Sequence, residues 1–150
     1  MNQPERRWAP AIGWVAVLIQ ALYRFGWMPL SVFIAHELSA HVFRLYGRWR
    51  QVDVPLHLLG GFAVAYFISN GLTLVIGTGL ADAPHPAIRY ALLFGMICAA
   101  AMFWEFAEWI ADRTIGTCCQ LGLDDTLFDM VNGLTGGACY LILDRLSHNG

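Results

Sequence analysis

The chain has 150 residues, of which 57% are hydrophobic and only 13% are charged, and its mean hydropathy is +0.52. Soluble domains carry about 25% charged residues, so this composition excludes an ordinary water-soluble domain and favours one membrane-embedded unit. The nine cations are all arginine, the net charge is −2 and no basic stripe stands out, so we expect no nucleic-acid partner.

The apolar residues occur in long unbroken runs. Residues 54–80 and 90–104 contain no Asp, Glu, Lys or Arg. A helix needs about 20 mostly apolar residues to cross about 30 Å of hydrocarbon, and runs this continuous are typical of helices rather than of alternating barrel strands. The predicted fold class is therefore an all-α integral membrane protein: one domain, a bundle of about four transmembrane helices with an interfacial helix after the first.

The first predicted span covers residues 11–35, and we expect Pro29 to kink or end it. No small-x-small cleavage pattern follows this run, so we expect a retained span rather than a signal peptide. Residues 36–50 then carry an apolar stripe with helical spacing, made of Leu38, Val42, Leu45 and Trp49. This stripe predicts a helix lying along the lipid headgroups; the alternative is a helical extension of the first span into water.

His36, Glu37 and His41 fall within this predicted interfacial helix. A carboxylate and an imidazole at E-x-x-x-H spacing are one turn apart and can bind a metal ion together. A solvated face of an interfacial helix explains the same residues more simply, and that is the interpretation we favour.

The other three predicted spans cover residues 54–77, 87–112 and 125–146. Asp53 is placed to cap the first of these, two prolines mark the turn at 79–86, and a short loop follows at 113–124. Gly133 and Gly137 have the GxxxG spacing that allows close helix contact, and one expectation is a homodimer through them. The arginines of the two membrane sides balance, so the positive-inside rule does not orient the chain.

Polar residues inside the apolar spans carry the functional information, because charge at bilayer depth costs about 2.5–3.5 kcal/mol per group. Glu105, Glu108 and Asp112 lie at i, i+3 and i+7, on one face of the third span. The fourth span presents a matching face, made of Asp125, Asp129, Asn132 and Gly136. A short loop joins the two spans as an antiparallel hairpin, so both faces are expected at the same membrane level.

The second span starts on the same membrane side, which brings His57 to this level beside the loop residue Gln120. The predicted polar pocket therefore comprises His57, Glu105, Glu108, Asp112, Gln120, Asp125, Asp129 and Asn132. Several of these residues also have a purely structural explanation: a helix cap for Asp125, an interfacial position for Asp112, a solvated loop for Gln120, a core histidine for His57 and an interhelical hydrogen bond for Asn132.

So many carboxylates in a low dielectric either hold protons or surround a cation. Carboxylates with one histidine suit Mg²⁺, Mn²⁺, Fe(II) or Zn²⁺, and a divalent ion beside a water-facing pocket can hold a phosphate or polarise a water. The predicted metal ligands are Glu105, Glu108, Asp129 and His57.

The segment WEFAEWIADRTIGTCCQLGLDDTLFDMVNGLTGG, residues 104–137, resembles the signature of the YjdF-type membrane family, W-E-x-x-E-W followed by Q-x-G-x-D-D-T-x-x-D. More distantly, the chain is similar to the VanZ-like superfamily. The matching positions are Asp53 with His57, Glu108 with Gln120, and Asp129 with Asn132 and Gly133. The N-terminal third shows no match. The resemblance implies a small multi-span protein of the bacterial inner membrane, connected with the cell envelope, and implies no particular reaction.

Three functions fit the sequence. The favoured one is metal-dependent binding or processing of an envelope lipid or phosphate headgroup by the acidic pocket. A proton-relay or transport element and an accessory subunit of a larger membrane complex are the alternatives. No nucleophile–base pair is evident, so we assign no catalytic residues, and whether the protein is an enzyme stays open.

Overall fold

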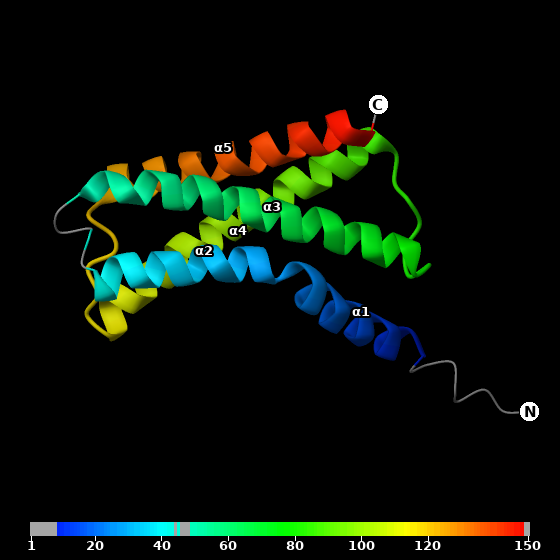
Figure 1. Cartoon of the computed structure of the whole chain (residues 1–150), viewed down its shortest axis with the longest axis horizontal. Coiled ribbons are helices and arrows are strands. Elements are labelled where there is room, and N and C mark those ends of the chain that lie inside the picture. The colour runs from blue at the N-terminus through cyan, green and yellow to red at the C-terminus, as the bar shows by residue number, and fades with distance from the viewer. Residues whose placement is uncertain (1–8, 44, 46–48, 149–150) are drawn as a thin grey trace, which may run out of the picture.

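The computed structural model describes residues 9–43, 45 and 49–148, and its regular elements are all helices (Figure 1). Three helices are long and apolar enough to cross a membrane: α3 (Asp53–Gly77), α4 (Pro86–Thr114) and α5 (Leu123–His148). A bent pair, α1 (Ala9–Phe25) and α2 (Trp27–Glu37), meets the same requirement when the two are taken as one span. The predicted all-α membrane bundle is confirmed.

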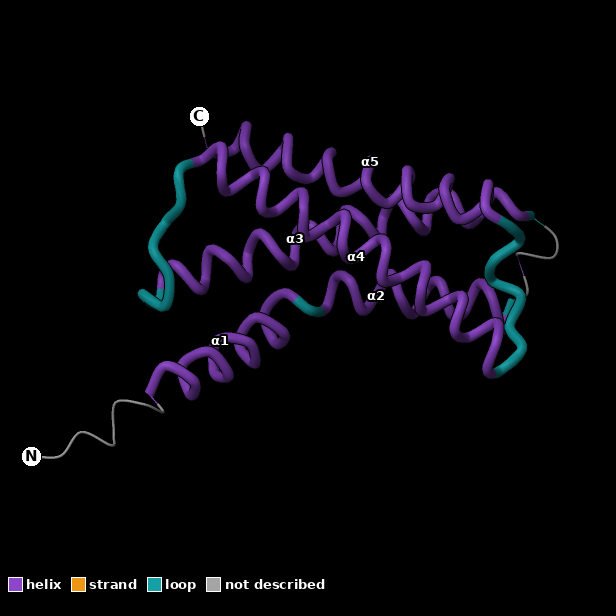
Figure 2. Tube along the Cα trace, turned by 180° about the vertical axis from the view of Figure 1, so that it is seen from behind, coloured by secondary structure: helices purple, strands orange, loops and turns teal. Residues whose placement is uncertain are grey.

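The first span breaks at Gly26 rather than at Pro29. The segments 13–25 and 27–40 meet at an angle of 59°, so α1 runs in a different direction from α2 (Figure 2), and both helices pack against α3. Pro29 explains the break although it lies inside α2, because its ring excludes the carbonyl of the residue four positions earlier and it has no N–H to donate. The kink therefore forms one turn before the proline.

The first half of the region predicted as an interfacial helix, residues 36–50, continues the preceding helix, as the alternative of a helical extension of the first span has it. Residues 36 and 37 belong to α2, and a π-helical turn over Leu38–Val42 continues the same helix. A short 3-10 turn over Arg50–Val52 then leads into α3, while residues 44 and 46–48 lie outside the described part of the chain. The face of α2 that packs against the bundle continues as far as His36, and the side chain of His36 is buried there.

The helices α3 and α5 lie side by side (Figure 1), and glycines bring their backbones into contact. A Cβ atom at Gly61 would overlap the carbonyl oxygen of Gly133, and one at Gly136 would overlap the carbonyl oxygen of Leu58. Close packing of this kind replaces the hydrophobic driving force that helices lack in lipid. The contact fixes the axial register of α3 against α5.

The helix α4 completes the bundle against α3 and α5. Ile97 packs on Gly137, 2.6 Å from the position that a Cβ there would take, and belongs to a buried cluster with Ala65, Leu93 and Leu141. Gly133 and Gly137 are thus both used for packing inside the chain. Their close contacts join helices of one molecule, and the homodimer expected through these two glycines stays a prediction.

The helix ends gather the acidic residues at one end of the bundle. The α2 extension and α4 end there, and α3 and α5 begin there, at the left of Figure 1. Asp53 is the first residue of α3, and the cap position belongs to Val52, so the expected capping role of Asp53 is wrong. The side chain of Asp53 points instead toward the next turn of its own helix, where His57 lies.

The adjacent residues Gly60 and Gly61 provide a test of the α3–α5 contact. We expect Gly61→Ala to destabilise the protein by about 1–3 kcal/mol, because the added methyl group forces the two backbones apart. Gly60→Ala is expected to be neutral or to stabilise by up to about 1 kcal/mol, because its Cβ lies 3.9 Å from Val32 and alanine favours the helix. Thermal unfolding in detergent measures both changes; equal effects would contradict the assigned contact.

Candidate functional site

The loop between α4 and α5 is held by Asp112. Its Oδ1 accepts hydrogen bonds from Thr117 Oγ1 and from the backbone N–H of Cys119, and its Oδ2 accepts one from the N–H of Gln120 at 3.0 Å. The Gln120 side chain then turns inward and donates to the backbone oxygen of Glu105 at 2.9 Å and to its Oε2 at 3.2 Å. Asp112 thus orders the loop that positions Gln120, and Gln120 orients Glu105.

Two helix starts bring Asp53, His57 and Asp129 together. His57 Nε2 lies 3.2 Å from Asp53 Oδ1, one turn earlier on α3, and 3.9 Å from Asp129 Oδ1 on α5. The His57 side chain is 8% exposed, and Nε2 is buried without a well-formed hydrogen bond. The donor atoms of all three residues lie within 4.8 Å of one another. One nitrogen and two carboxylate oxygens therefore face a common point.

A second imidazole–carboxylate contact lies next to the first. His36 Nε2, from α2, is 3.7 Å from Glu108 Oε1 on α4, and the same carboxylate oxygen accepts a hydrogen bond from Trp104 Nε1 at 2.9 Å. The ring of His36 packs edge-on against Trp104 at 5.3 Å and against His57 at 6.5 Å between centroids. These contacts join α2 to α3 and α4 at the level of the acidic residues.

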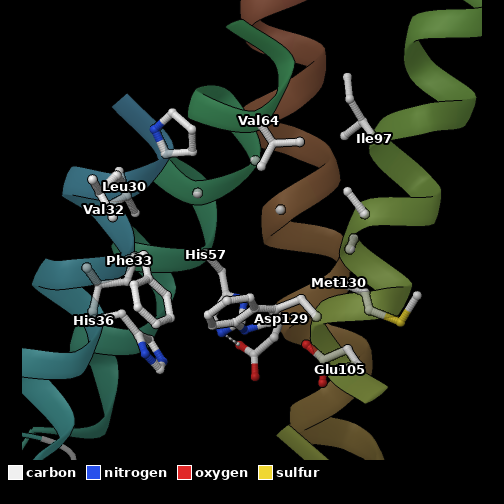
Figure 3. A pocket seen from close by; sticks show the side chains of 18 residues that line it. Leu30, Val32, Phe33, His36, His57, Val64, Ile97, Glu105, Asp129 and Met130 are labelled. Carbon is white, nitrogen blue, oxygen red and sulfur yellow. Dashed lines mark ion pairs between the residues drawn. The ribbon is translucent and has the colours of Figure 1, made fainter. Parts of the chain in front are cut away.

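A cavity of about 420 Å³ lies between α2, α3, α4 and α5 and reaches the acidic end of the bundle. Its polar lining is concentrated at that end, where His36, His57, Glu105 and Asp129 lie close together (Figure 3). The opposite end is apolar, with Val64 and Ile97 in the same view. No arginine or lysine lines the cavity in the part of the chain that the structure describes.

The predicted pocket residues fall into two groups. His57, Glu105 and Asp129 line the cavity, and Glu108 is buried beside it against Trp104 and His36. Four others do not line it: Asp112, Gln120, Asp125 and Asn132. Asp125 accepts a hydrogen bond from the backbone N–H of Leu121 at 3.1 Å, and the buried Asn132 Nδ2 has no hydrogen-bond partner.

The predicted metal ligands are also regrouped. Glu105 and Glu108 are not among the three residues whose donor atoms converge, whereas Asp53 joins His57 and Asp129. The D-x-x-x-H spacing of Asp53 and His57 was visible in the sequence, but treating Asp53 as a helix cap hid its contact with the histidine. Its position in the first turn of α3 leaves the carboxylate facing His57.

His36 and Trp104 were not predicted to belong to the site. His36 was expected on a solvated face, yet it is buried and lines the cavity, while the side chain of His41 lies outside the described residues. A sequence signal was present: Pro29, Val32, Phe33 and His36 share one helix face, at spacings of three and four. All four line the cavity.

Residues 8–150 match the model of a family described as "Predicted membrane protein (DUF2238)". The chain belongs to this family. This DUF2238 protein is also similar to a Thermotoga maritima protein named "Uncharacterized protein", with 32% identity over 111 residues. That match covers 73% of this chain and 54% of the relative, so the chain spans about half the length of the relative it matches. No solved structure matches.

Two separations in this DUF2238 protein can be compared with those of ligands on one cation. Two ligands bound about 2.1 Å from an ion, at tetrahedral or octahedral angles, lie about 3.0–3.4 Å apart. The contact of His57 with Asp53, at 3.2 Å, falls in this range, whereas its contact with Asp129, at 3.9 Å, is longer. The same geometry would let a protonated imidazole bridge the two carboxylates. Chemically, the arrangement can therefore hold either a metal ion or a shared proton.

The neighbouring thiols Cys118 and Cys119 test the structure of the loop. Cys118 is exposed, whereas Cys119 is partly buried, and burial raises the pKa of its thiol. A raised pKa leaves less thiolate near neutral pH, so in single-cysteine variants we expect Cys118 to react with a maleimide about tenfold faster at pH 7. The rate at Cys119 should rise as the pH increases. A membrane-impermeant maleimide also reports which side this loop faces, and a faster reaction at Cys119 would contradict the assigned burial.

Proposed function

We propose that this protein binds a divalent cation at Asp53, His57 and Asp129 and uses the ion to hold the phosphate headgroup of a membrane lipid. The observation that carries the proposal is the convergence of three donor groups within 4.8 Å at the polar end of an otherwise apolar cavity. Three protein ligands leave coordination positions for oxygens of a phosphate, as in other open metal sites.

Charge supports a cation at this point. With His57 neutral, Asp53 and Asp129 bring two negative charges to a place where Asp129 is 7% exposed and His57 is 8% exposed. Burying the Asp129 carboxylate is costly unless a positive group faces it, and in the part of the chain that the structure describes no guanidinium or ammonium group lines the cavity. A divalent ion supplies positive charge at this point and also gives the buried Nε2 of His57 a partner.

The depth of the site supports a headgroup ligand. His57 lies four residues into α3 and Asp129 six residues into α5, which at 1.5 Å per residue places them about 6 and 9 Å from the helix starts. That is a shallow position relative to about 30 Å of hydrocarbon. The bacterial relative supports placement in the cytoplasmic membrane of a bacterium.

A proton-relay element is the second candidate. It is favoured by a row of titratable side chains that alternates carboxylates and imidazoles. Glu108 contacts His36, and the rings of His36 and His57 lie 6.5 Å apart. His57 in turn contacts Asp129. Such a row can pass protons between neighbouring groups. It differs from the first candidate in needing no metal ion.

Metal binding decides between the two. We expect the purified protein to bind one Mn²⁺ per chain, measured by the loss of the free-ion electron paramagnetic resonance signal. Asp129→Asn should weaken binding about 100-fold or more, since losing even a second-shell partner costs 10–100-fold. At an Mn²⁺ concentration about 100 times Kd, binding should add about 2.7 kcal/mol of stability, so thermal unfolding should shift upward in the wild type and not in Asp129→Asn.

The matched control is Asp124→Asn. Asp124 lies on the same helix and at the same end of the bundle, but its side chain is exposed and outside the converging group. This variant should bind Mn²⁺ like the wild type. A wild-type protein that takes up no divalent ion, or one whose affinity is unchanged by Asp129→Asn, would contradict the metal site and favour the proton relay.

A further inference from the structure

We propose that the ligand of the cavity is a single-chain amphiphile: one hydrocarbon chain lies between α2, α3, α4 and α5, and its phosphate headgroup reaches Asp53, His57 and Asp129. This inference rests on the metal-dependent function proposed above and adds the class of lipid that the site accepts. It is carried by the size of the cavity and by its apolar lining beyond the donor cluster.

The cavity lining is amphipathic along its length. From α2, α3, α4 and α5 respectively, Leu30, Val64, Ile97 and Met130 contribute apolar side chains, whereas the imidazoles and carboxylates meet at one end (Figure 3). A ligand that fills such a cavity must have an apolar part and a polar end. Because lipid tails are as apolar as these side chains, apolar lining alone does not select a ligand from the bilayer, and selection depends on the headgroup end and on the available width.

Small residues determine that width. Gly60 and Gly61 on α3, Ala100 and Ala101 on α4 and Gly133 on α5 all line the cavity. Gly61 and Gly133 are already in backbone contact, so this wall cannot recede. At Gly60, by contrast, the nearest atom to a Cβ would be Val32 Cγ1 at 3.9 Å, which leaves room on the side facing α2.

The volume admits one chain. A cavity of about 420 Å³ lies near the small end of the range of about 300–1,000 Å³ that ligand pockets span. This size suits one hydrocarbon chain better than the two chains of a diacyl lipid. The headgroup end is bounded by aromatic rings, because Phe33 and His36 of α2 both pack edge-on against Trp104 of α4.

The experiment measures lipid and metal binding separately. Protein in phosphatidylcholine nanodiscs is titrated with dodecyl phosphate, with and without Mn²⁺, and bound lipid is counted by native mass spectrometry. Inorganic phosphate, a two-chain phosphatidic acid and dodecylammonium are tested in parallel. We expect one dodecyl phosphate per chain, dependent on Mn²⁺, at least tenfold weaker retention of phosphatidic acid and no retention of dodecylammonium; inorganic phosphate should bind more weakly because it has no chain.

Filling the cavity should remove the lipid and spare the ion. Gly60→Leu and, on the opposite wall, Ala100→Leu should each reduce dodecyl phosphate binding at least tenfold while still binding Mn²⁺, which also shows that the variants are folded. The control is Gly71→Leu on the same helix, where a side chain would meet open space; it should bind both ligands like the wild type.

The outcomes separate the two proposals. Mn²⁺ binding without dodecyl phosphate binding, or equal lipid binding by the wild type and both filled variants, would overturn the single-chain inference and leave the metal site in place. Equal affinity for inorganic phosphate would show that the ligand is a free anion. Tight binding of dodecylammonium without Mn²⁺, or failure to bind Mn²⁺ at all, would overturn both proposals.

Discussion

The contact between the backbones of α3 and α5 is the constraint on which the rest of the structure depends. Gly61 against Gly133 and Gly136 against Leu58 set the height of one helix relative to the other without an intervening side chain. That register places the first turns of α3 next to the second turn of α5, and so brings His57 to within 3.9 Å of Asp129. The polar cluster is a consequence of apolar packing.

The same run of small residues has two opposite effects on neighbouring positions. Consecutive residues of a helix point about 100° apart, so Gly61 faces α5 while Gly60 faces α2 and the cavity. Absence of a side chain allows backbone contact at the first position and leaves space at the second. Because lipid tails are as apolar as the side chains of the bundle, no hydrophobic effect drives the helices together. A cavity beside a tight contact therefore does not forfeit the hydrophobic stabilisation that it would forfeit in a water-soluble protein.

Helix topology made part of the site predictable. Spans joined by short loops must return to the same membrane surface, so the placement of His57 and Asp129 at the same membrane level follows from topology, and the glycine contacts then set their separation. The partition of the α4 carboxylates does not. Glu105 and Glu108 are three residues apart and so diverge by about 60° around the helix, which is enough to send one to the cavity and Gln120 and the other to His36 and Trp104.

For Asp112, position along the helix axis determines whether the side chain reaches the cavity. Asp112 projects in nearly the same direction as Glu105 but lies about 10 Å further along the axis, where it meets the backbone of the loop rather than the cavity. The burial of His36 depended on where α2 bends. Pro29 was identified as the source of the bend, but a proline acts on the preceding turn, and only the resulting 59° angle turns the continuation of α2 onto α3 and α4.

A second polar region lies in the other half of the bundle, and its separation from the first bears on function. It contains hydrogen bonds between Arg89 and Ser69, between Tyr90 and Asp144, and between Asn70 and Tyr140. Between the two regions along α3 and α4 lies the buried apolar cluster, in which Ala65 and Leu93 are 0% exposed and Ile97 is 1% exposed. A charge crossing the membrane through this bundle would have to pass those side chains without a polar partner. The free-energy cost would resemble that of placing a charge at the centre of the bilayer. A ligand that places its headgroup at one end and its chain against the apolar cluster meets no such barrier, and this is the arrangement that the cavity offers.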